Sequence, residues 1–206
     1  NNFQAVQILG GIPVSVPVKP ETGFEIEVEE FERRLTNRTK MVILTNPNNP
    51  TTVVYSRKSM EVLADFVKKN DLIIVVDQAF EDIVFDEKEM VTMASLEGMF
   101  ERTITIFSIS KGFGLSGLRV GYIVAPDVLI DTMFASAVSV IGASNTASQL
   151  AAITALHKRK ALLRDYKETF DYRRKVLYDA LRDIPGVEMQ IPQSAFLSWI
   201  DVSKLG

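Results

Sequence analysis

The sequence predicts an α/β fold in which helices cover a mainly parallel β-sheet. Short apolar runs bounded by turn residues alternate with amphipathic stretches of helical period, which is the pattern of strand and helix in such folds. Several of these runs are apolar throughout, as expected for strands buried on both faces. A chain of 206 residues with 47% hydrophobic side chains can bury one sizeable core.

In the first half, the clearest elements are a strand, a polar loop and a helix. The apolar run at 41–44 stops at residues 45–50, which are too rich in Asn and Pro to continue it. Ser56 is the expected N-cap of a helix to about Lys69. Its apolar face would carry Met60, Leu63, Ala64 and Val67. Other expected elements are a β-rich run at 14–18, a helical stretch at 28–35 and a buried strand at 72–76.

The second half predicts two further strands and then helices. The expected strands lie at 103–107 and 118–124, and helical patterns begin at Pro126, near Asn145 and near Lys158. Ile184-Pro-Gly186 breaks the last helix, and short β runs follow at 187–190 and 195–202. We therefore expect a large domain at residues 1–183, ending in a long connecting helix from about 158, and the beginning of a small α+β domain at 184–206.

Composition excludes several classes of function. A net charge of -3 provides no cationic field for nucleic acid. The absence of cysteine excludes thiolate catalysis and cysteine-ligated metals, and His157 alone cannot form a histidine zinc site, so we expect no metal. We expect no secretion signal, because the first residues show neither a charged n-region nor an apolar h-region, and no apolar run reaches the roughly 20 residues of a membrane helix. We expect a cytoplasmic protein without a membrane partner.

Polar residues follow three of the predicted strands. They are Asn46 to Asn49, Asp77, and Ser108 to Lys111. Ligands bind at the carboxyl ends of strands in open α/β sheets, so these groups are expected to converge on one site.

Gly112, Gly114 and Gly117 form a G-x-G-x-x-G pattern within this site. The pattern follows a strand, as in dinucleotide-binding proteins, but it leads into the β-rich run LRVGYIVA instead of opening a helix. No helix N-terminus is therefore offered to a pyrophosphate, and we do not interpret the glycines as a dinucleotide cradle.

Lys111 suits a different cofactor, because an amine at the end of a buried strand can bind an aldehyde. Pyridoxal phosphate needs such an amine, a carboxylate for its ring nitrogen, a donor for its ring hydroxyl and cationic or hydroxyl groups for its phosphate. Each residue alone also has an ordinary explanation as a surface, turn or capping residue. The candidates for the four roles are Lys111, Asp77, Asn49, and the group Ser108, Ser110 and Arg119.

The combined order resembles the signature of the class I/II aminotransferases, which are fold-type I pyridoxal phosphate enzymes. The matching segments are Asn49-Pro-Thr51, Asp77-Gln-Ala-Phe80, Ser108-Ile-Ser-Lys111 and Arg119-Val-Gly121. Residues 10–18 resemble the family's stretch ahead of the Asn loop and residues 192–203 the opening of its small domain, so the resemblance covers nearly the whole chain. The resemblance implies that Lys111 forms the Schiff base, Asp77 contacts the ring nitrogen and Asn49 contacts the ring hydroxyl. It assigns the phosphate to Ser108, Ser110 and Arg119.

The same resemblance implies a homodimeric enzyme that moves an amino group between an amino acid and a 2-oxo acid. Phe80 stands where the family usually has Tyr, which removes a hydrogen bond to the ring hydroxyl. Thr52 stands where Gly is usual, and this is tolerable if the backbone keeps a negative φ. Family members extend further at both ends, so we expect a central fragment without the phosphate loop.

Three alternatives remain open at this stage. A C–S β-lyase on the same fold would use the same cofactor-binding residues. An aminotransferase-like ligand-sensing domain would bind without catalysis. The chain alone could also bind no cofactor, because the expected phosphate loop lies outside it.

Overall fold

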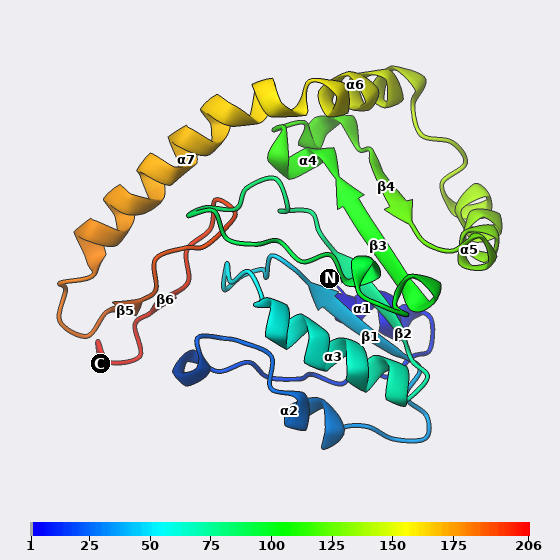
Figure 1. Ribbon diagram of the computed structural model, residues 1–206. Coiled ribbons are helices and arrows are strands. Elements are labelled where there is room, and N and C mark those ends of the chain that lie inside the picture. The colour runs from blue at the N-terminus through cyan, green and yellow to red at the C-terminus, as the bar shows by residue number, and fades with distance from the viewer. Residues whose placement is uncertain (1) are drawn as a thin grey trace.

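A four-stranded sheet forms the centre of the protein, whose computed structural model describes residues 2–206 (Figure 1). The strands lie in the order β1 (Met41–Thr45), β2 (Ile73–Asp77), β3 (Thr103–Ser108) and β4 (Gly121–Val124). β1 pairs with β2 and β2 pairs with β3 in parallel, whereas β4 runs antiparallel to β3. The predicted α/β fold with a mainly parallel sheet is confirmed.

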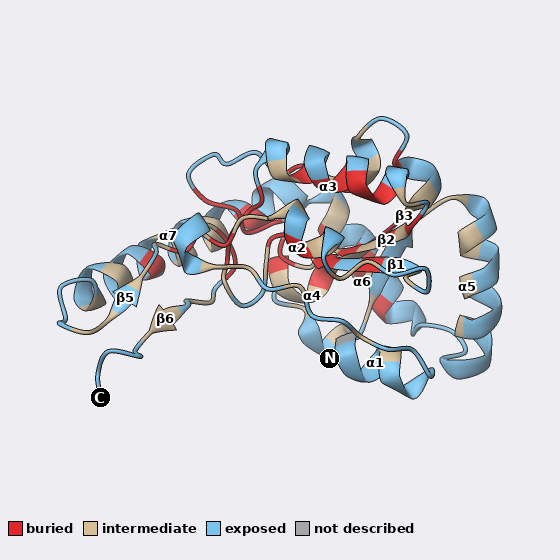
Figure 2. Cartoon of the chain, turned by 90° about the horizontal axis from the view of Figure 1, so that it is seen from below, coloured by how far each residue is buried: buried red, intermediate tan, exposed pale blue. Residues whose placement is uncertain are grey.

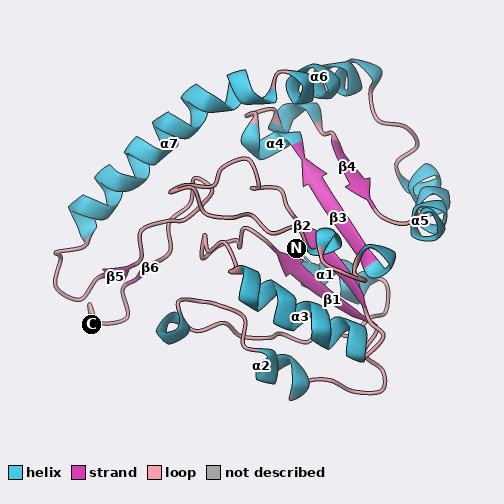
Figure 3. Ribbon diagram, in the orientation of Figure 1, coloured by secondary structure: helices cyan, strands magenta, loops and turns pink. Residues whose placement is uncertain are grey.

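Helices precede, link and follow these strands (Figure 3). The N-terminal half contains α1 (Asn2–Ile8), α2 (Val28–Glu32) and α3 (Arg57–Lys69). The second half contains α4 (Ile109–Gly112), α5 (Asp127–Val140), α6 (Thr146–His157) and α7 (Arg159–Leu181). The expected long helix from about residue 158 is thus present as α7. It leads to β5 (Glu188–Met189) and β6 (Ile200–Asp201), which form a separate antiparallel sheet.

The main hydrophobic core lies between α3 and the sheet, where Figure 2 shows the buried residues concentrated. α3 begins where expected, because the Ser56 side chain accepts a hydrogen bond from the backbone N–H of Ser59 at 3.2 Å. Its predicted apolar face is confirmed: Met60, Leu63 and Val67 are fully buried. Burying each such side chain contributes about 1.5–3 kcal/mol, so this face fixes α3 on the sheet.

The opposite side of the sheet is covered less completely. Met41 and Ile43 of β1 are 43% and 40% exposed, all four residues of β4 are exposed, and α5 contains no buried residue. In Figure 2, α1 lies on this side, across the sheet from α3. No helix within residues 2–206 is both long enough and apolar enough to cross a bilayer.

Three sequence predictions of strands were wrong: one strand is absent and two are shorter than expected. Residues 14–18 form irregular chain, because no strand pairs with their backbone. The strand expected at 118–124 starts only at Gly121, because a 3₁₀ turn at Ser116–Leu118 and a left-handed residue at Arg119 come first. In the stretch 195–202 only β6 forms a strand, and the preceding residue Ser194 bridges Val84 instead.

Candidate functional site

The carboxyl ends of β1, β2 and β3 lie together at one edge of the sheet. Thr45 is paired with Asp77 in the β1–β2 register, and Asp77 is paired with Ile106 of β3. The backbone N–H of Asn46 donates to the carbonyl of Asp77 at 3.0 Å, which extends this alignment beyond β1. The loop after β1, the turn after β2 and α4 after β3 therefore leave the sheet side by side. This is where ligand-binding groups gather in open α/β sheets.

Lys111 is carried by α4, a single helical turn directly after β3. Ser108 caps this turn, since its Oγ accepts a hydrogen bond from the backbone N–H of Ser110 at 3.1 Å. Ile109 anchors it in the core with 1% exposure. The Lys111 side chain is half-buried, and its Nζ lies 5.9 Å from the ring centroid of Phe196.

A groove connects Lys111 with the other predicted ring contacts. Its volume is about 1170 Å³, and it runs from the strand ends along the outward side of β1. Asp77 keeps its orientation at the end of β2 because its Oδ1 accepts a hydrogen bond from the N–H of Ala79 at 3.0 Å. Four of the seven predicted site residues line this groove, namely Asn49, Asp77, Phe80 and Lys111.

The three predicted phosphate contacts do not line the groove. The Ser108 Oγ serves as the cap acceptor of α4. Arg119 is exposed, has a left-handed φ of 52°, and donates from Nη1 to the carbonyl of Ser116 at 2.8 Å. The structure therefore brings together the residues predicted to contact the ring, and their roles, like the phosphate role of Ser108, Ser110 and Arg119, stay predictions.

Buried polar contacts hold the loop after β1 in place. Asn46 is fully buried, donates to the carbonyl of Val91 at 3.3 Å and accepts from the N–H of Tyr55 at 3.2 Å. The Asn48 amide donates to the Tyr55 hydroxyl at 2.9 Å. Burial raises the pKa of Tyr55 to about 12, although the Asn48 hydrogen bond acts in the opposite direction. Tyr55 is therefore a neutral structural residue at physiological pH.

Phe80 and Thr52, the two residues that depart from the family pattern, are both buried, and of the two only Phe80 lines the groove. Phe80 is 4% exposed, and its ring meets Phe196 edge-on at 5.5 Å. Thr52 has a φ of 66°, so the condition under which threonine would be tolerated here without strain, a negative φ, is not met. Its carbonyl accepts from the Ser194 hydroxyl at 2.7 Å and its N–H donates to the carbonyl of Asn48 at 2.9 Å. These two bonds pin the backbone in the conformation that glycine adopts most easily.

Sequence reasoning missed a charged cluster beside Lys111. Arg159, the first residue of α7, donates from Nε to Asp82 Oδ1 at 2.6 Å and from Nη2 to Glu81 Oε1 at 3.2 Å. Burial raises the pKa of Glu81 to about 7, against the attraction of Arg159, and also raises the pKa of Asp82. The available signal was two acidic residues directly after Phe80, where the chain leaves a buried strand.

The groove residues fit the ring of pyridoxal phosphate by their chemistry. Lys111 supplies an amine, Asp77 a carboxylate with one oxygen outside its turn hydrogen bond, and Asn49 an amide. These are the groups that an aldehyde, a ring nitrogen and a ring hydroxyl require.

Comparison with known proteins places this arrangement in a family. The family model of "Aminotransferase class I and II" matches residues 3–205. An aspartate aminotransferase of Pyrococcus abyssi is 35% identical, and an aromatic-amino-acid aminotransferase of Thermococcus litoralis is 34% identical. Each alignment covers 98% of this chain and 52% of the relative.

Solved structures agree with the sequence comparison. The aspartate aminotransferase of Thermus thermophilus with maleate superposes with a TM-score of 0.93 at 29% identity, over 99% of this chain and 53% of that one. The aromatic aminotransferase of Pyrococcus horikoshii gives 0.88 at 36% identity, over 93% and 52%. The chain thus spans about half the length of the relatives it matches. It belongs to the class I and II aminotransferase family.

Proposed function

We propose that this chain carries the ring-binding part of a pyridoxal phosphate site in an aminotransferase. The observation that supports this most directly is that Lys111, Asp77 and Asn49 line one groove at the carboxyl ends of three strands. Membership of the family supports the activity. The reaction would move an amino group from an amino acid to a 2-oxo acid.

The roles of the residues follow from their chemistry. When bound, pyridoxal phosphate supplies an aldehyde that takes up amino groups and a ring that withdraws electrons from the substrate Cα. Lys111 would hold the cofactor covalently through its amine. The same amine, when free, would be the general base and acid for the proton at the substrate Cα.

Asp77 and Asn49 would orient the ring and tune its charge. The Asp77 carboxylate would accept a hydrogen bond from the ring nitrogen and keep that nitrogen protonated. The Asn49 amide would donate to the ring hydroxyl, and Phe80 would offer an apolar edge where a Tyr hydroxyl is usual. Ser108, Ser110 and Arg119 would contact the phosphate after local rearrangement.

The same proposal includes the organisation of the intact enzyme. Residues 1–183 would belong to the large domain and 184–206 would begin the small one, since α7 ends at Leu181 and β5 and β6 form their own sheet. Family membership supports a cytoplasmic homodimer. Sedimentation of the full-length protein would test the dimer.

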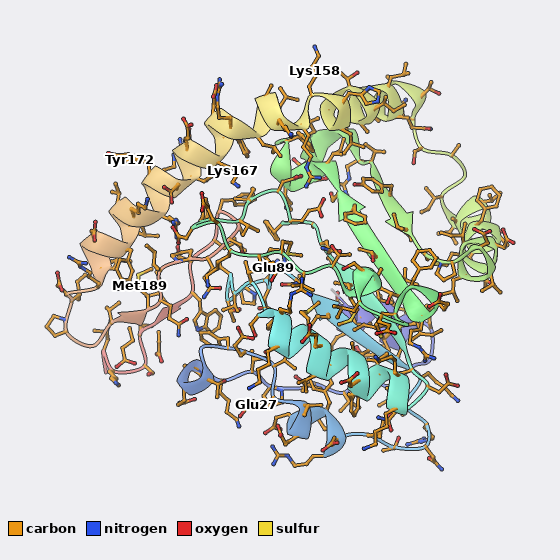
Figure 4. The ribbon with its side chains drawn as sticks, in the orientation of Figure 1. Glu27, Glu89, Lys158, Lys167, Tyr172 and Met189 are labelled. Carbon is orange, nitrogen blue, oxygen red and sulfur yellow. The ribbon has the colours of Figure 1, made fainter. Side chains whose placement is uncertain are left out.

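The test of the cofactor site is covalent trapping. The chain is mixed with pyridoxal phosphate, freed of excess, reduced with borohydride and mapped by peptide mass spectrometry. We expect the adduct on Lys111, its loss in Lys111→Ala, and its retention in Lys158→Ala. Lys158 is exposed at the junction of α6 and α7 and points away from the protein (Figure 4). An adduct spread over surface lysines, in this chain and in the full-length protein, would refute the proposal.

The test of the reaction uses the full-length protein. An amino donor and a 2-oxo acid should give the corresponding amino acid and 2-oxo acid without release of ammonia. Release of ammonia and pyruvate from a cysteine conjugate, with no amino transfer, would instead identify a β-lyase.

A further inference from the structure

Two carboxylates and an arginine form a cluster beside the helix that carries Lys111. Asp82 is the more deeply buried acid, with a side chain that is 5% exposed, and Glu81 is 18% exposed. Arg159 binds both from the start of α7, through the 2.6 Å and 3.2 Å contacts described above. Lys167, on the inner side of α7 in Figure 4, also acts electrostatically on Asp82. None of these residues has a role in the mechanism proposed above.

Asp82 lies directly against the backbone of Gly112. A Cβ atom placed on Gly112 would come within 2.3 Å of Asp82 Oδ2 and 2.6 Å of Asp82 Cβ, which no real side chain tolerates. Gly112 is the last residue of α4 and its φ is not left-handed, so glycine is needed here for the close approach and not for its backbone freedom. The acidic side chain therefore touches the residue that follows Lys111.

This contact matters because α4 cannot hold its own position. A helix of four residues makes too few internal hydrogen bonds to be stable alone, so tertiary contacts decide where it lies. At the N-terminal end of α4 these contacts are the Ser108 cap and the buried Ile109. At its C-terminal end the contact is Asp82 against Gly112, and Asp82 comes from the same segment as Asp77 and Phe80.

We propose that Asp82, held by Arg159, is a positioning residue that sets where α4 places the Lys111 amine relative to Asp77. Its meaning for catalysis rests on the proposed function. Asp82 acts through Gly112 and not by touching the substrate or the cofactor. Arg159 is required because a buried carboxylate without a counter-charge would turn toward solvent or take up a proton.

The test measures Lys111 without any cofactor. The chain is treated with a trace of acetic anhydride, and the acetylation of Lys111 is expressed relative to that of the exposed Lys158 in the same sample. In Asp82→Ala, α4 loses its support and the half-buried amine becomes more accessible. We expect the ratio to rise by about threefold or more.

Matched variants separate positioning from general damage. Asp82→Asn keeps the shape against Gly112 and an acceptor for Arg159, so its ratio should stay close to that of the unmodified chain. Gly112→Ala displaces Asp82 from the opposite side and should raise the ratio as Asp82→Ala does. Asp71→Asn removes an exposed carboxylate that pairs with Arg102 at 3.1 Å, and it should change nothing. Circular dichroism at the labelling temperature selects only folded variants.

Two results would overturn the proposal. One is an unchanged or lower ratio in folded Asp82→Ala and Gly112→Ala. The other is a rise that also occurs in Asp71→Asn, since it would reflect general loosening. If Asp82→Ala is unfolded at that temperature, the comparison of Gly112→Ala with Asp82→Asn decides.

The outcome is independent of the cofactor assignment. If pyridoxal phosphate never attaches to Lys111 but the labelling ratio depends on Asp82, the proposed function fails and the positioning role stands. If pyridoxal phosphate attaches to Lys111 while the labelling ratio is unchanged in Asp82→Ala and Gly112→Ala, the proposed function stands and the positioning role fails.

Discussion

Thr52 shows how a single backbone angle can conflict with a side chain. A β-branched residue at a φ of 66° is strained, because its Cβ crowds the neighbouring carbonyl. The two backbone hydrogen bonds to Asn48 and Ser194 keep Thr52 there despite the strain. The Thr52 side chain is also buried, so its removal has a cost of its own.

Comparing glycine with alanine at position 52 measures the strain of the backbone alone, because both variants lose the buried threonine side chain. We expect Thr52→Gly to have a free energy of unfolding about 1 kcal/mol higher than Thr52→Ala, which reverses the usual order of these residues. Urea unfolding of the two variants measures this difference. Equal stabilities, or a more stable alanine variant, would show that the backbone at Thr52 is not strained.

Glu81 makes the stability of the protein depend on pH in an unusual direction. In the unfolded chain its carboxyl ionises near 4.5, whereas burial raises its pKa to about 7 in the folded protein. Between these values the folded state holds more protons than the unfolded state. The contribution of Glu81 to the free energy of unfolding therefore falls as pH rises through this window.

Replacing Glu81 by glutamine should remove this loss while keeping a partner for Arg159. As pH rises from 4.5 to 8, the free energy of unfolding of Glu81→Gln should increase by about 1–2 kcal/mol relative to that of the unmodified chain. Partial contact of Glu81 with solvent keeps the gain below what the full pKa shift would give. Urea unfolding at a series of pH values measures the gain. Glu61→Gln, at an exposed site on α3, is the control. A pH-independent difference for Glu81→Gln would contradict the raised pKa.

At the scale of elements, local signals predicted α3 and α7 well. α3 has a capping serine and an apolar stripe, and both act where they stand in the sequence. The prediction of a strand at residues 14–18 was wrong because a strand also needs a neighbouring strand to pair with, and composition alone does not reveal one. The N-terminal helix α1 was not expected, since it carries neither an acidic first turn nor a basic last turn.

In the candidate site, too, residues marked by local sequence signals could be predicted, whereas a residue placed by long-range contacts could not. Asp77 ends one buried strand and Lys111 lies three residues after the end of the next, so the strand ends were enough to predict that these residues lie near each other. Arg159 could not be found like this, because 77 residues separate it from its partner Asp82. A contact of that range depends on the path of α6 and α7, which run past the end of the sheet near α4 (Figure 1). The residues next to Asp82 or Arg159 in sequence do not determine that path.

At the scale of the whole molecule, Arg174 joins segments that are distant in sequence. Its side chain is 4% exposed and lies on α7, the helix that spans the distance from α6 to β5 (Figure 1). It binds Asp86 through both guanidinium ends at 2.5 and 2.9 Å, Asp171 at 2.7 Å and the carbonyl of Pro192 at 2.7 Å. It therefore ties the chain after β2 and the chain before β6 to the same helix.

Truncating Arg174 should loosen this junction as a unit. We expect Arg174→Ala to lower the free energy of unfolding by about 3 kcal/mol, at the lower end for a broken buried pair because Asp86 is half-exposed. Hydrogen exchange should quicken at the N–H groups of Phe85 and Ala195, which bond to the carbonyls of Gln193 and Ile83. Arg182→Ala, at an exposed site at the end of α7, should cost less than about 0.5 kcal/mol.

The loss in Arg174→Ala should also depend on pH. The hydrogen bond from Arg174 lowers the pKa of Asp86 below its usual 3.8, so the stabilisation is present above that pH and is lost as pH falls through the folded value. Unfolding curves of the unmodified chain and Arg174→Ala should therefore converge in acid. A difference that stays constant from neutral pH to below 3.8 would mean that Arg174 stabilises the junction through its pH-independent contacts, which are the hydrogen bond to the carbonyl of Pro192 and packing against the ring of Phe85, 4.3 Å away.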